Sequence, residues 1–472
     1  MEQPRLVPRH HALERAFVHS RAYLDGLDVT SVAATATTDE LRTRLLRPLA
    51  DDGVEPARVI DEMVADSAGG LLGSAGGRFF GWVIGGALPA ALAADWLTSA
   101  WDQNSGLYAC GPASAVIEET CGIWLKDLLG LPPAASFALV TGCQMSHVTC
   151  LAAARHRLLA SRGWDVERGG LSGAPHIRIL TADTRHSSID RAVRLLGFGT
   201  DSIVNLSADE QCRLTARALA QALREAAGVP TIVVLQAGDI NTGAFDPFEE
   251  LVPLAHEHGA WVHVDGAFGL WVNACPPRRA PLRGVETADS WSTDGHKWLN
   301  VPYDCGYAFV ADPDAHRAAM SIRASYLTHD DDARDQLDWT PEFSRRGRGL
   351  ATYAAIRQLG RTGISDLVER CCRHARELSV RIGALPGAEL VWEARINQGL
   401  VRFRDPGPMA TEADHATRTD EVIARIQQAG EAFFGGTTWQ SKRCMRISVC
   451  NWQTNDRDVD RAVGAVERAL VE

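Results

Sequence analysis

The sequence predicts an α/β protein built on a mainly parallel sheet that is flanked by helices. Short apolar runs alternate with helical patterns from Phe137 to Val310, and this alternation is typical of strands joined by crossover helices. The chain has 472 residues, of which 46% are hydrophobic and 23% charged, as expected for a globular protein with a sizeable core. We therefore expect one large α/β body with smaller parts at its ends.

The first 70 or so residues indicate a polar helical arm rather than an independent domain. Thr38-Asp-Glu-Leu-Arg is a typical helix start, and so is Pro56 ahead of an apolar-periodic stretch. Apolar residues three and four positions apart then predict helices at 89–100 and 115–129. We expect residues 1–88 to form this arm and to contribute to dimerisation.

A glycine-rich stretch between the arm and the body carries Phe79, Phe80 and Trp82. Clustered aromatic side chains in such a loop suit a pocket wall or a subunit interface, and the alternative is plain core packing. The sequence leaves both interpretations open.

The body is predicted to hold six strands with helices between them. The helix that follows the fourth strand has the clearest start, with Asp246 as its N-cap, Pro247 in its first position and Glu249 in its first turn. The expected strands are 137–140, 176–181, 202–206, 231–236, 260–265 and 306–310, and the expected helices between them include 189–196, 215–226 and 248–258.

A polar stretch at 317–344, which includes His329-Asp-Asp-Asp332, interrupts this pattern and is typical of a functional loop. A helix at 350–359 then leads to a small C-terminal α/β domain, with strands at 400–404 and 445–449 and helices at 419–429 and 456–470. The predicted division is therefore 1–88, 89–345 and 346–472.

Composition excludes several classes of protein. The net charge of −11 argues against a nucleic-acid binder, which usually has a basic face. No apolar run approaches the roughly 20 residues of a membrane helix, and the N-terminus lacks a signal-peptide pattern, so a cytoplasmic protein is expected. The eleven cysteines show no CxxC pair or zinc-like spacing, which predicts reduced thiols and no metal site.

Two residues suggest the chemistry. The apolar strand Ala260-Trp-Val-His-Val-Asp265 ends in a carboxylate, which is costly to bury without a partner, and Lys297 follows in ADSWSTDGHKWLN. A buried lysine with a lowered pKa can form a Schiff base, and an aspartate can pair with a protonated pyridine nitrogen. The working hypothesis is therefore a site for pyridoxal phosphate.

Two further segments follow predicted strands, where ligands bind in open α/β sheets. Thr141-Gly-Cys-Gln144 opens a helix whose N-terminus could hold a phosphate, although small residues at a helix start are common. His186 could stack on a planar ring, and the alternative is that it caps the following helix or lies on the surface.

With these residues in place, the chain resembles the group II pyridoxal-phosphate-dependent amino-acid decarboxylases. HVDGAFG and ADSWSTDGHKWLNVPYDCG carry the resemblance, and further family-like segments occur in family order from about Arg78 to the end: TGCQMSHVTCLAAARH, TADTRHSSIDRAVRLLG, QAGDINTGAFDP, RRGRGL and MRISVCNW. The resemblance implies an aspartate-aminotransferase-like fold, pyridoxal 5'-phosphate as cofactor, and a homodimer with its active site between the subunits.

The resemblance also implies roles for individual residues. Lys297 would be the Schiff-base lysine, with His296 beside it to reach the phosphate or the substrate. Asp265 would pair with the pyridine nitrogen, while Ala267 and His186 would lie on the two faces of the ring. The remaining implied residues are Gly142, Cys143 and Gln144 around the phosphate and Arg446 near the substrate, Arg446 being equally compatible with a structural ion pair. The aromatic cluster of the glycine-rich loop adds Phe80 and Trp82 as candidate substrate contacts.

The sequence departs from better-known members at two places. Cys143 and Gln144 stand where small hydroxyl residues are usual, and no tyrosine follows Tyr326 in the loop that normally supplies a proton to the carbanion. The predicted reaction is decarboxylation of an L-amino acid to its amine.

Four alternatives remain. Two are other reactions on the same scaffold, namely decarboxylation coupled to oxidative deamination and carbon–carbon lyase chemistry. The third is a non-catalytic homologue that binds the cofactor. A nicotinamide-binding protein ranks last, because no GxGxxG follows a strand. The substrate is left open, since the aromatic residues suit an aromatic amino acid and Arg446 an acidic one.

Overall fold

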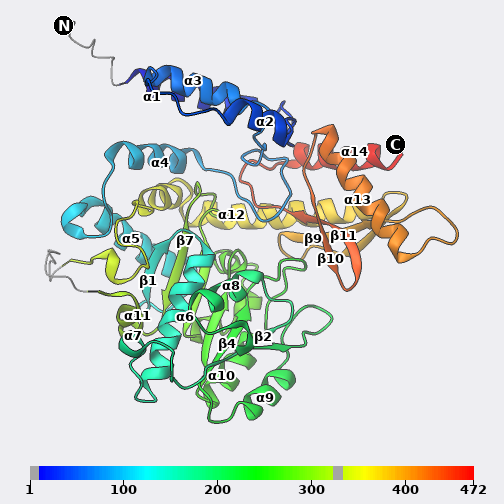
Figure 1. Cartoon of the computed structure of the whole chain (residues 1–472). Coiled ribbons are helices and arrows are strands. Elements are labelled where there is room, and N and C mark those ends of the chain that lie inside the picture. Colours follow the sequence, from blue (N-terminus) through cyan, green and yellow to red (C-terminus); the bar gives the residue numbers. More distant parts are fainter. Residues whose placement is uncertain (1–9, 323–332, 472) are drawn as a thin grey trace, which may run out of the picture.

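The computed structural model describes residues 10–322 and 333–471. Its main sheet has the order β1-β7-β6-β5-β4-β2-β3, in which β7 is antiparallel to both neighbours and the other pairs are parallel (Figure 1). The predicted mainly parallel sheet is thus confirmed. Its strands are β1 (Ser136–Val140), β2 (Arg178–Ala182), β3 (Ile203–Leu206), β4 (Thr231–Gln236), β5 (Trp261–Asp265), β6 (Ser290–Asp294) and β7 (Gly306–Val310).

Both faces of this sheet are buried, as the strand β4 illustrates. Successive side chains of a strand point to opposite faces, so Ile232 and Val234 join one apolar cluster while Val233 and Leu235 join the other. The first cluster is covered by α6 (Cys143–Ala160) and α8 (Ser187–Leu195), and the second by α9 (Ala216–Glu225) and α10 (Phe248–Glu257). Burial on both sides explains why these strands are continuously apolar.

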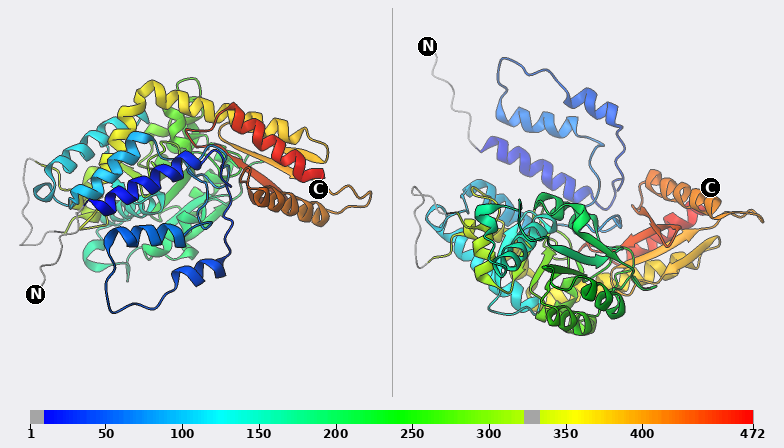
Figure 2. Two further views of the ribbon diagram at one scale, coloured as in Figure 1. Left: turned by 90° about the horizontal axis from the view of Figure 1, so that it is seen from above. Right: turned by 60° about the horizontal axis from the view of Figure 1, so that its bottom comes forward.

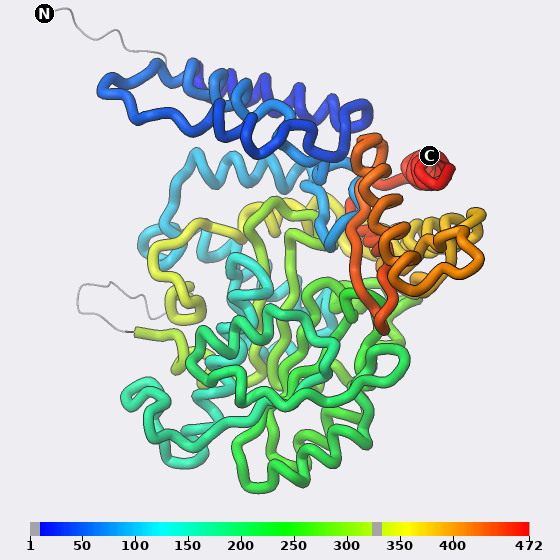
Figure 3. Tube along the Cα trace, turned by 45° about the vertical axis from the view of Figure 1, so that its right-hand side comes forward, coloured from blue at the N-terminus to red at the C-terminus, as the bar shows by residue number. Residues whose placement is uncertain are grey.

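Three helices form the N-terminal arm: α1 (His11–Gly26), α2 (Thr38–Leu45) and α3 (Pro56–Asp66). They project from the body in the right-hand view of Figure 2 and in Figure 3, and neither α1 nor α2 buries a single residue. The predicted start of α2 is confirmed, because the Thr37 hydroxyl accepts a hydrogen bond from the Glu40 N–H while the Glu40 carboxylate accepts one from Thr37.

A second sheet near the C-terminus is antiparallel, with the order β10-β11-β9-β8. The helices α12 and α13 pack on it, and α14 packs on those two helices. The bounds are β8 (Ala388–Trp392), β9 (Gln398–Phe403), β10 (Gly435–Trp439), β11 (Lys442–Ser448), α12 (Gly349–Gly383), α13 (Glu412–Ala429) and α14 (Asp456–Val471); the remaining helices are α4 (Pro89–Trp101), α5 (Pro112–Leu128), α7 (Val166–Gly169) and α11 (Pro313–Met320).

The element α12 consists of two helices joined at Gly360, whose φ of 60° and ψ of −178° are not helical. The first of them ends directly before this glycine, as the prediction of a helix that ends at residue 359 requires, and the second continues to Gly383. Glycine adopts this left-handed φ without a Cβ clash, so the chain changes direction there.

Other sequence predictions need correction. Strands β6, β8 and β10 were not predicted; β6, Ser-Trp-Ser-Thr-Asp, is largely polar yet buried throughout. Asp246 is not the N-cap of α10, because Pro247 holds that position. The Asp246 carboxylate instead accepts hydrogen bonds from the backbone N–H groups of Leu214 and Gln236. The predicted loop residues Tyr326 and His329–Asp332 lie outside the described residues.

All eleven cysteines are free thiols, and within residues 10–322 and 333–471 no disulfide joins them. In the same part of the chain, no helix has the length and apolar character needed to cross a membrane.

Candidate active site

The carboxyl ends of the parallel strands converge on one cavity of about 490 Å³. Asp265 ends β5, Lys297 follows β6, and Cys143 begins α6 directly after β1. Predicted residues that line this cavity are Gly142, Cys143, Gln144, His186, Asp265, Ala267, His296 and Lys297, and the sequence analysis did not select its further lining residues Phe268, Asp294 and Tyr303.

Lys297 is paired with the carboxylate of Asp294, which was not among the predicted site residues. Its Nζ lies 3.1 Å from Oδ2 of Asp294 and 5.9 Å from the centre of the Phe268 ring. Burial lowers the pKa of Lys297, but the Asp294 carboxylate opposes this effect, and the net result is a raised pKa. The expected lowered pKa is therefore wrong for this structure, in which Lys297 is an ammonium group that must lose a proton before it can act as a nucleophile.

Asp294 also caps the helix that follows β1. Its Oδ1 accepts a hydrogen bond of 2.6 Å from the backbone N–H of Cys143, and its side chain is almost fully buried. The sequence signal was a carboxylate at the end of β6, three residues ahead of Lys297. It was missed because Ser-Trp-Ser-Thr-Asp lacks the apolar pattern by which strands are recognised.

Asp265 is a buried carboxylate held from two sides. Its Oδ1 accepts a hydrogen bond of 3.2 Å from the Ala267 N–H, and its Oδ2 lies 3.6 Å from Nε2 of His147. Burial raises the pKa of Asp265, but His147, His186 and Lys297 together outweigh burial and leave the pKa below its ordinary value. Asp265 is thus an anion placed to meet a cationic partner in the cavity.

The two predicted histidines have different settings. His186 is the N-cap of α8, where its Nδ1 accepts a hydrogen bond of 3.2 Å from the Ser188 N–H. The same side chain also lines the cavity, so the capping role and a contact to a ligand are compatible. His296 stacks on Tyr303 with ring centres 4.2 Å apart, and its Nδ1 accepts a hydrogen bond from the Cys305 N–H. Burial lowers the pKa of His296, which favours the neutral ring.

The start of α6 forms a cradle for an anion. Gly142 lies so close to its neighbours that an added Cβ would be 3.1 Å from Cε1 of His296 and 3.4 Å from Oδ1 of Asp294. Backbone N–H groups and the helix dipole favour negative charge at this end of a helix. The Gln144 side chain points away to Ser188, where Nε2 donates to the carbonyl oxygen at 3.3 Å.

Three predicted substrate residues do not line this cavity. Phe80 is fully buried and stacks on Phe434 in the core, which corrects the expectation of a pocket wall formed within one chain. Trp82 is 51% exposed and packs beside Phe433. Arg446 is close to the cavity, since its Nη1 donates a hydrogen bond of 3.4 Å to the carbonyl oxygen of Ile240, which is a lining residue.

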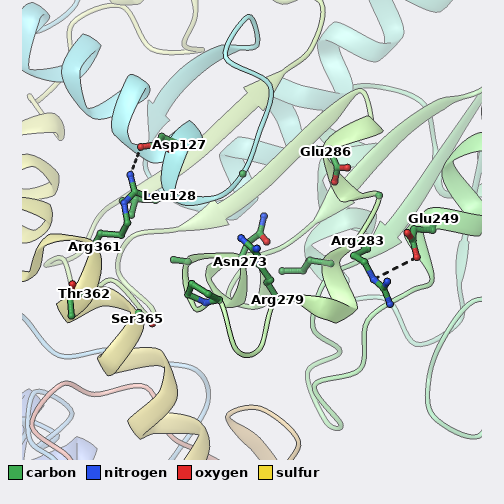
Figure 4. A pocket seen from close by; sticks show the side chains of 15 residues that line it. Asp127, Leu128, Glu249, Asn273, Arg279, Arg283, Glu286, Arg361, Thr362 and Ser365 are labelled. Atoms are coloured by element: carbon green, nitrogen blue, oxygen red, sulfur yellow. Dashed lines mark hydrogen bonds and ion pairs between the residues drawn. The ribbon is translucent and has the colours of Figure 1, made fainter.

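A larger cavity of about 760 Å³ lies elsewhere, between α5, α12 and the segment after β5 (Figure 4). Acidic and basic side chains around it neutralise one another, as in the pair Arg361–Asp127 and the pair Arg283–Glu249, whose charged atoms are 3.8 Å apart. Because these two ion pairs are mostly exposed, we assign no chemistry to this cavity.

The residues of the smaller cavity suit one particular group. A lysine amine, a buried carboxylate without a strong ion pair, and a helix N-terminus match the aldehyde, the pyridine nitrogen and the phosphate of pyridoxal phosphate. Fold and site together define a pyridoxal-phosphate enzyme.

Comparison with known proteins gives the family. Residues 74–405 match the pyridoxal-dependent decarboxylase conserved domain, so the chain belongs to this family of carboxy-lyases. It is 25% identical over 445 residues to aromatic-L-amino-acid decarboxylase of Bacillus atrophaeus, covering 93% of this chain and 90% of that protein. It is 29% identical over 398 residues to histidine decarboxylase of Mus musculus, and the match covers 80% of this chain and 58% of that protein. The crystal structure of Oryza sativa TDC with PLP and tryptamine has a TM-score of 0.92 and 22% identity, covering 100% of this chain and 99% of that chain.

Proposed function

We propose that this chain removes the α-carboxylate of an L-amino acid and releases the amine, with Lys297 as the residue that bonds to pyridoxal phosphate. The observation that carries the proposal is the convergence of Lys297, Asp265 and the N-terminus of α6 on one cavity. The cofactor supplies an electron sink for the pair of electrons that the departing carboxylate leaves behind.

The remaining roles follow from position. Asp265 is the partner for the protonated pyridine nitrogen, because its lowered pKa keeps it anionic. Asp294 is placed to exchange a proton with the Lys297 amine at 3.1 Å. Proposed contacts to the cofactor are Ala267 and His186 at the two faces of the ring, and Gly142, Cys143, Gln144 and His296 at the phosphate.

Arg446 is the proposed anchor for a substrate carboxylate. Burial lowers the pKa of its guanidinium while Asp239 opposes the effect, and its Nη1 reaches the backbone of a residue that lines the cavity. The aromatic and histidine decarboxylases that the chain resembles support an amino-acid substrate without selecting one side chain.

We also propose a homodimer. The arm exposes large apolar side chains, among them Leu13 (61%), Phe17 (51%) and Leu46 (74%), which a monomer would leave in water. A second copy of the chain would cover them and would bring Trp82 beside a neighbouring site. In this proposal residues 1–88 serve dimerisation, 89–345 bind the cofactor and 346–472 form the small domain. The free thiols support a reducing compartment such as the cytoplasm.

The test of the site uses the scarcity of lysine in this chain. Only Lys126, Lys297 and Lys442 are present. Reduction of the loaded protein with borohydride, followed by peptide mass spectrometry, is expected to place the cofactor on Lys297. Lys297→Ala is expected to lose the visible absorbance band, while Lys442→Ala, a change at a half-exposed surface lysine, retains it. A modified Lys126 or Lys442 in place of Lys297 would refute the assignment.

The test of the reaction is a screen of amino acids. Carbon dioxide release, oxygen uptake and product mass are measured together for each candidate. An amine without oxygen uptake supports the proposal, whereas an aldehyde with oxygen uptake would replace it with oxidative deamination.

Light scattering of the wild type and of a Leu13→Asp/Phe17→Asp variant tests the dimer, which is expected to dissociate in the variant.

A further inference from the structure

A chain of hydrogen bonds runs through the core behind Asp265. The indole N–H of Trp261 donates to Oγ of Ser290 at 2.9 Å, and the same oxygen lies 2.9 Å from Nδ1 of His263. Nε2 of His263 is 2.9 Å from Nδ1 of His147, and Nε2 of His147 is 3.6 Å from Oδ2 of Asp265. All five side chains are buried, and both histidines are completely shielded from water.

These hydrogen bonds can be donated in only one direction along the series. The Asp265 carboxylate has no proton to donate, so the ring atom that faces it must carry one. A neutral His147 with its proton on Nε2 has a lone pair on Nδ1, which accepts from the Nε2–H of His263. His263 then has a lone pair on Nδ1 for the hydroxyl of Ser290, and that oxygen accepts from Trp261. With the opposite tautomers, a lone pair of His147 would face the carboxylate.

Burial favours the neutral form of both histidines, which this direction requires. Burial lowers the pKa of His263 to about 3, with a further contribution from the neighbouring His147. Burial also lowers the pKa of His147, although Asp265 and Asp294 oppose the effect. Each neutral ring therefore carries a single N–H proton. If that proton lies on the other ring nitrogen, a buried polar atom loses its hydrogen bond.

Among the residues that the structure describes, Nε2 of His147 has no hydrogen-bond partner, and Asp265 is the acceptor nearest in line. A metal ion is the competing occupant, because the Cys143 sulfur lies within 4.8 Å of both groups. Burial, with Asp294 adding to it, raises the pKa of Cys143 well above its ordinary value, which favours the thiol over the thiolate that would bind a metal. A hydrogen bond to the carboxylate is the arrangement that these groups favour.

We propose that His147 is a positioning residue for the cofactor: it donates to Oδ2 of Asp265 while the Ala267 N–H donates to Oδ1, which fixes the carboxylate toward the pyridine nitrogen. The inference rests on the proposed function, since it needs pyridoxal phosphate in the cavity. At 3.6 Å the two atoms are close enough for a small rotation of either side chain to form the hydrogen bond. His263, Ser290 and Trp261 act by holding the tautomer of His147.

The test compares two ligands on the purified apoprotein. One is pyridoxal phosphate, and the other is its carbocyclic analogue in which a C–H group replaces the ring nitrogen. The variants are His147→Leu, which removes the donor, and His147→Gln, whose amide can donate to Asp265 and accept from His263. His316→Leu is the matched control, because His316 is also fully buried but bonds to Ser136 and Trp339.

The wild type is expected to prefer pyridoxal phosphate over the analogue. His147→Leu is expected to weaken pyridoxal phosphate about tenfold or more, the usual effect of losing a hydrogen bond to a charged group, and to leave the analogue within about twofold. His147→Gln should keep most of the preference, and His316→Leu all of it. If His147→Leu weakens both ligands equally, or neither, the positioning role is overturned.

Two further results separate this inference from the proposed function. If the wild type binds both ligands equally well, Asp265 makes no favourable contact with the ring nitrogen. This result would overturn the proposed contact between Asp265 and the pyridine nitrogen together with the inference. Nitrogen-15 NMR of the apoprotein, assigned with the variants, is expected to show the Nε2–H tautomer at His147 and His263. A proton on Nδ1 of His147 would overturn the inference alone.

Discussion

The contact between Lys297 and Asp294 sets the pH at which the lysine can react. At 3.1 Å, two opposite unit charges attract by about 5 kcal/mol if the effective dielectric constant is about 20. Replacing Asp294 by Asn removes this attraction and leaves burial, which acts in the opposite direction, as the dominant influence on the pKa of Lys297. We expect Asp294→Asn to lower that pKa and to raise the fraction of neutral amine at neutral pH.

The effect is large enough to measure. Asp294 also accepts a hydrogen bond from Cys143, and Asp265 continues to favour the charged lysine, so only part of the attraction is lost in the variant. A quarter of it, about 1.4 kcal/mol, already changes the fraction of neutral amine tenfold. The rate at which the apoprotein captures an aldehyde at neutral pH is therefore expected to rise about tenfold or more.

The assay follows capture by absorbance from pH 6 to 10 and verifies the modified lysine by borohydride reduction. Pyridoxal is used beside pyridoxal phosphate, because removing a carboxylate also reduces repulsion of the phosphate. Asp304→Asn is the control, since Asp304 is a half-exposed carboxylate that pairs with Arg348 instead of Lys297. The rate for the wild type is expected to keep rising with pH, whereas Asp294→Asn levels off at lower pH. Unchanged pH dependence in Asp294→Asn, or a change toward higher pH, would refute the reasoning.

Three other outcomes are expected. His186→Ala should weaken cofactor binding about three- to tenfold, because stacking on the ring is lost, and His186→Phe should weaken it less. Cofactor affinity is measured by fluorescence titration, and an equal loss of affinity in both variants would argue against a ring contact. Gly142→Ala should weaken cofactor binding about fivefold, because the new Cβ crowds His296 at 3.1 Å, and an unchanged Kd would contradict this crowding. The 2.9 Å hydrogen bond to Asp289 raises the pKa of His256, so its stabilisation is present below the ordinary value and is lost as pH rises through the raised one. Thermal melting should therefore show His256→Gln to be less stable than the wild type at pH 5.5, by about 0.5 kcal/mol for this partly exposed pair, and nearly equal at pH 8.5.

Much of the fold was accessible from local pattern. The strands β4 and β7 have the predicted bounds, and Asp265 and Lys297, which the sequence suggests as a pair, line one cavity. This succeeds because hydrophobic periodicity depends on neighbouring residues, and because parallel strands bring their carboxyl ends to one edge. The strand β6 was not predicted, because its side chains are mostly polar and its burial comes from its central place in the sheet.

The sequence by itself determined the family and the cofactor, and it proposed the lysine. The tertiary structure decided the partners: Asp294 beside Lys297, His147 behind Asp265, and Phe80 in the core. Charge interactions depend on distance through space, and the chain places His147 on α6 next to a carboxylate more than a hundred positions away. The same holds for the expected lowered pKa of Lys297, because only the folded chain shows that the Asp294 carboxylate lies 3.1 Å from its Nζ and raises that pKa.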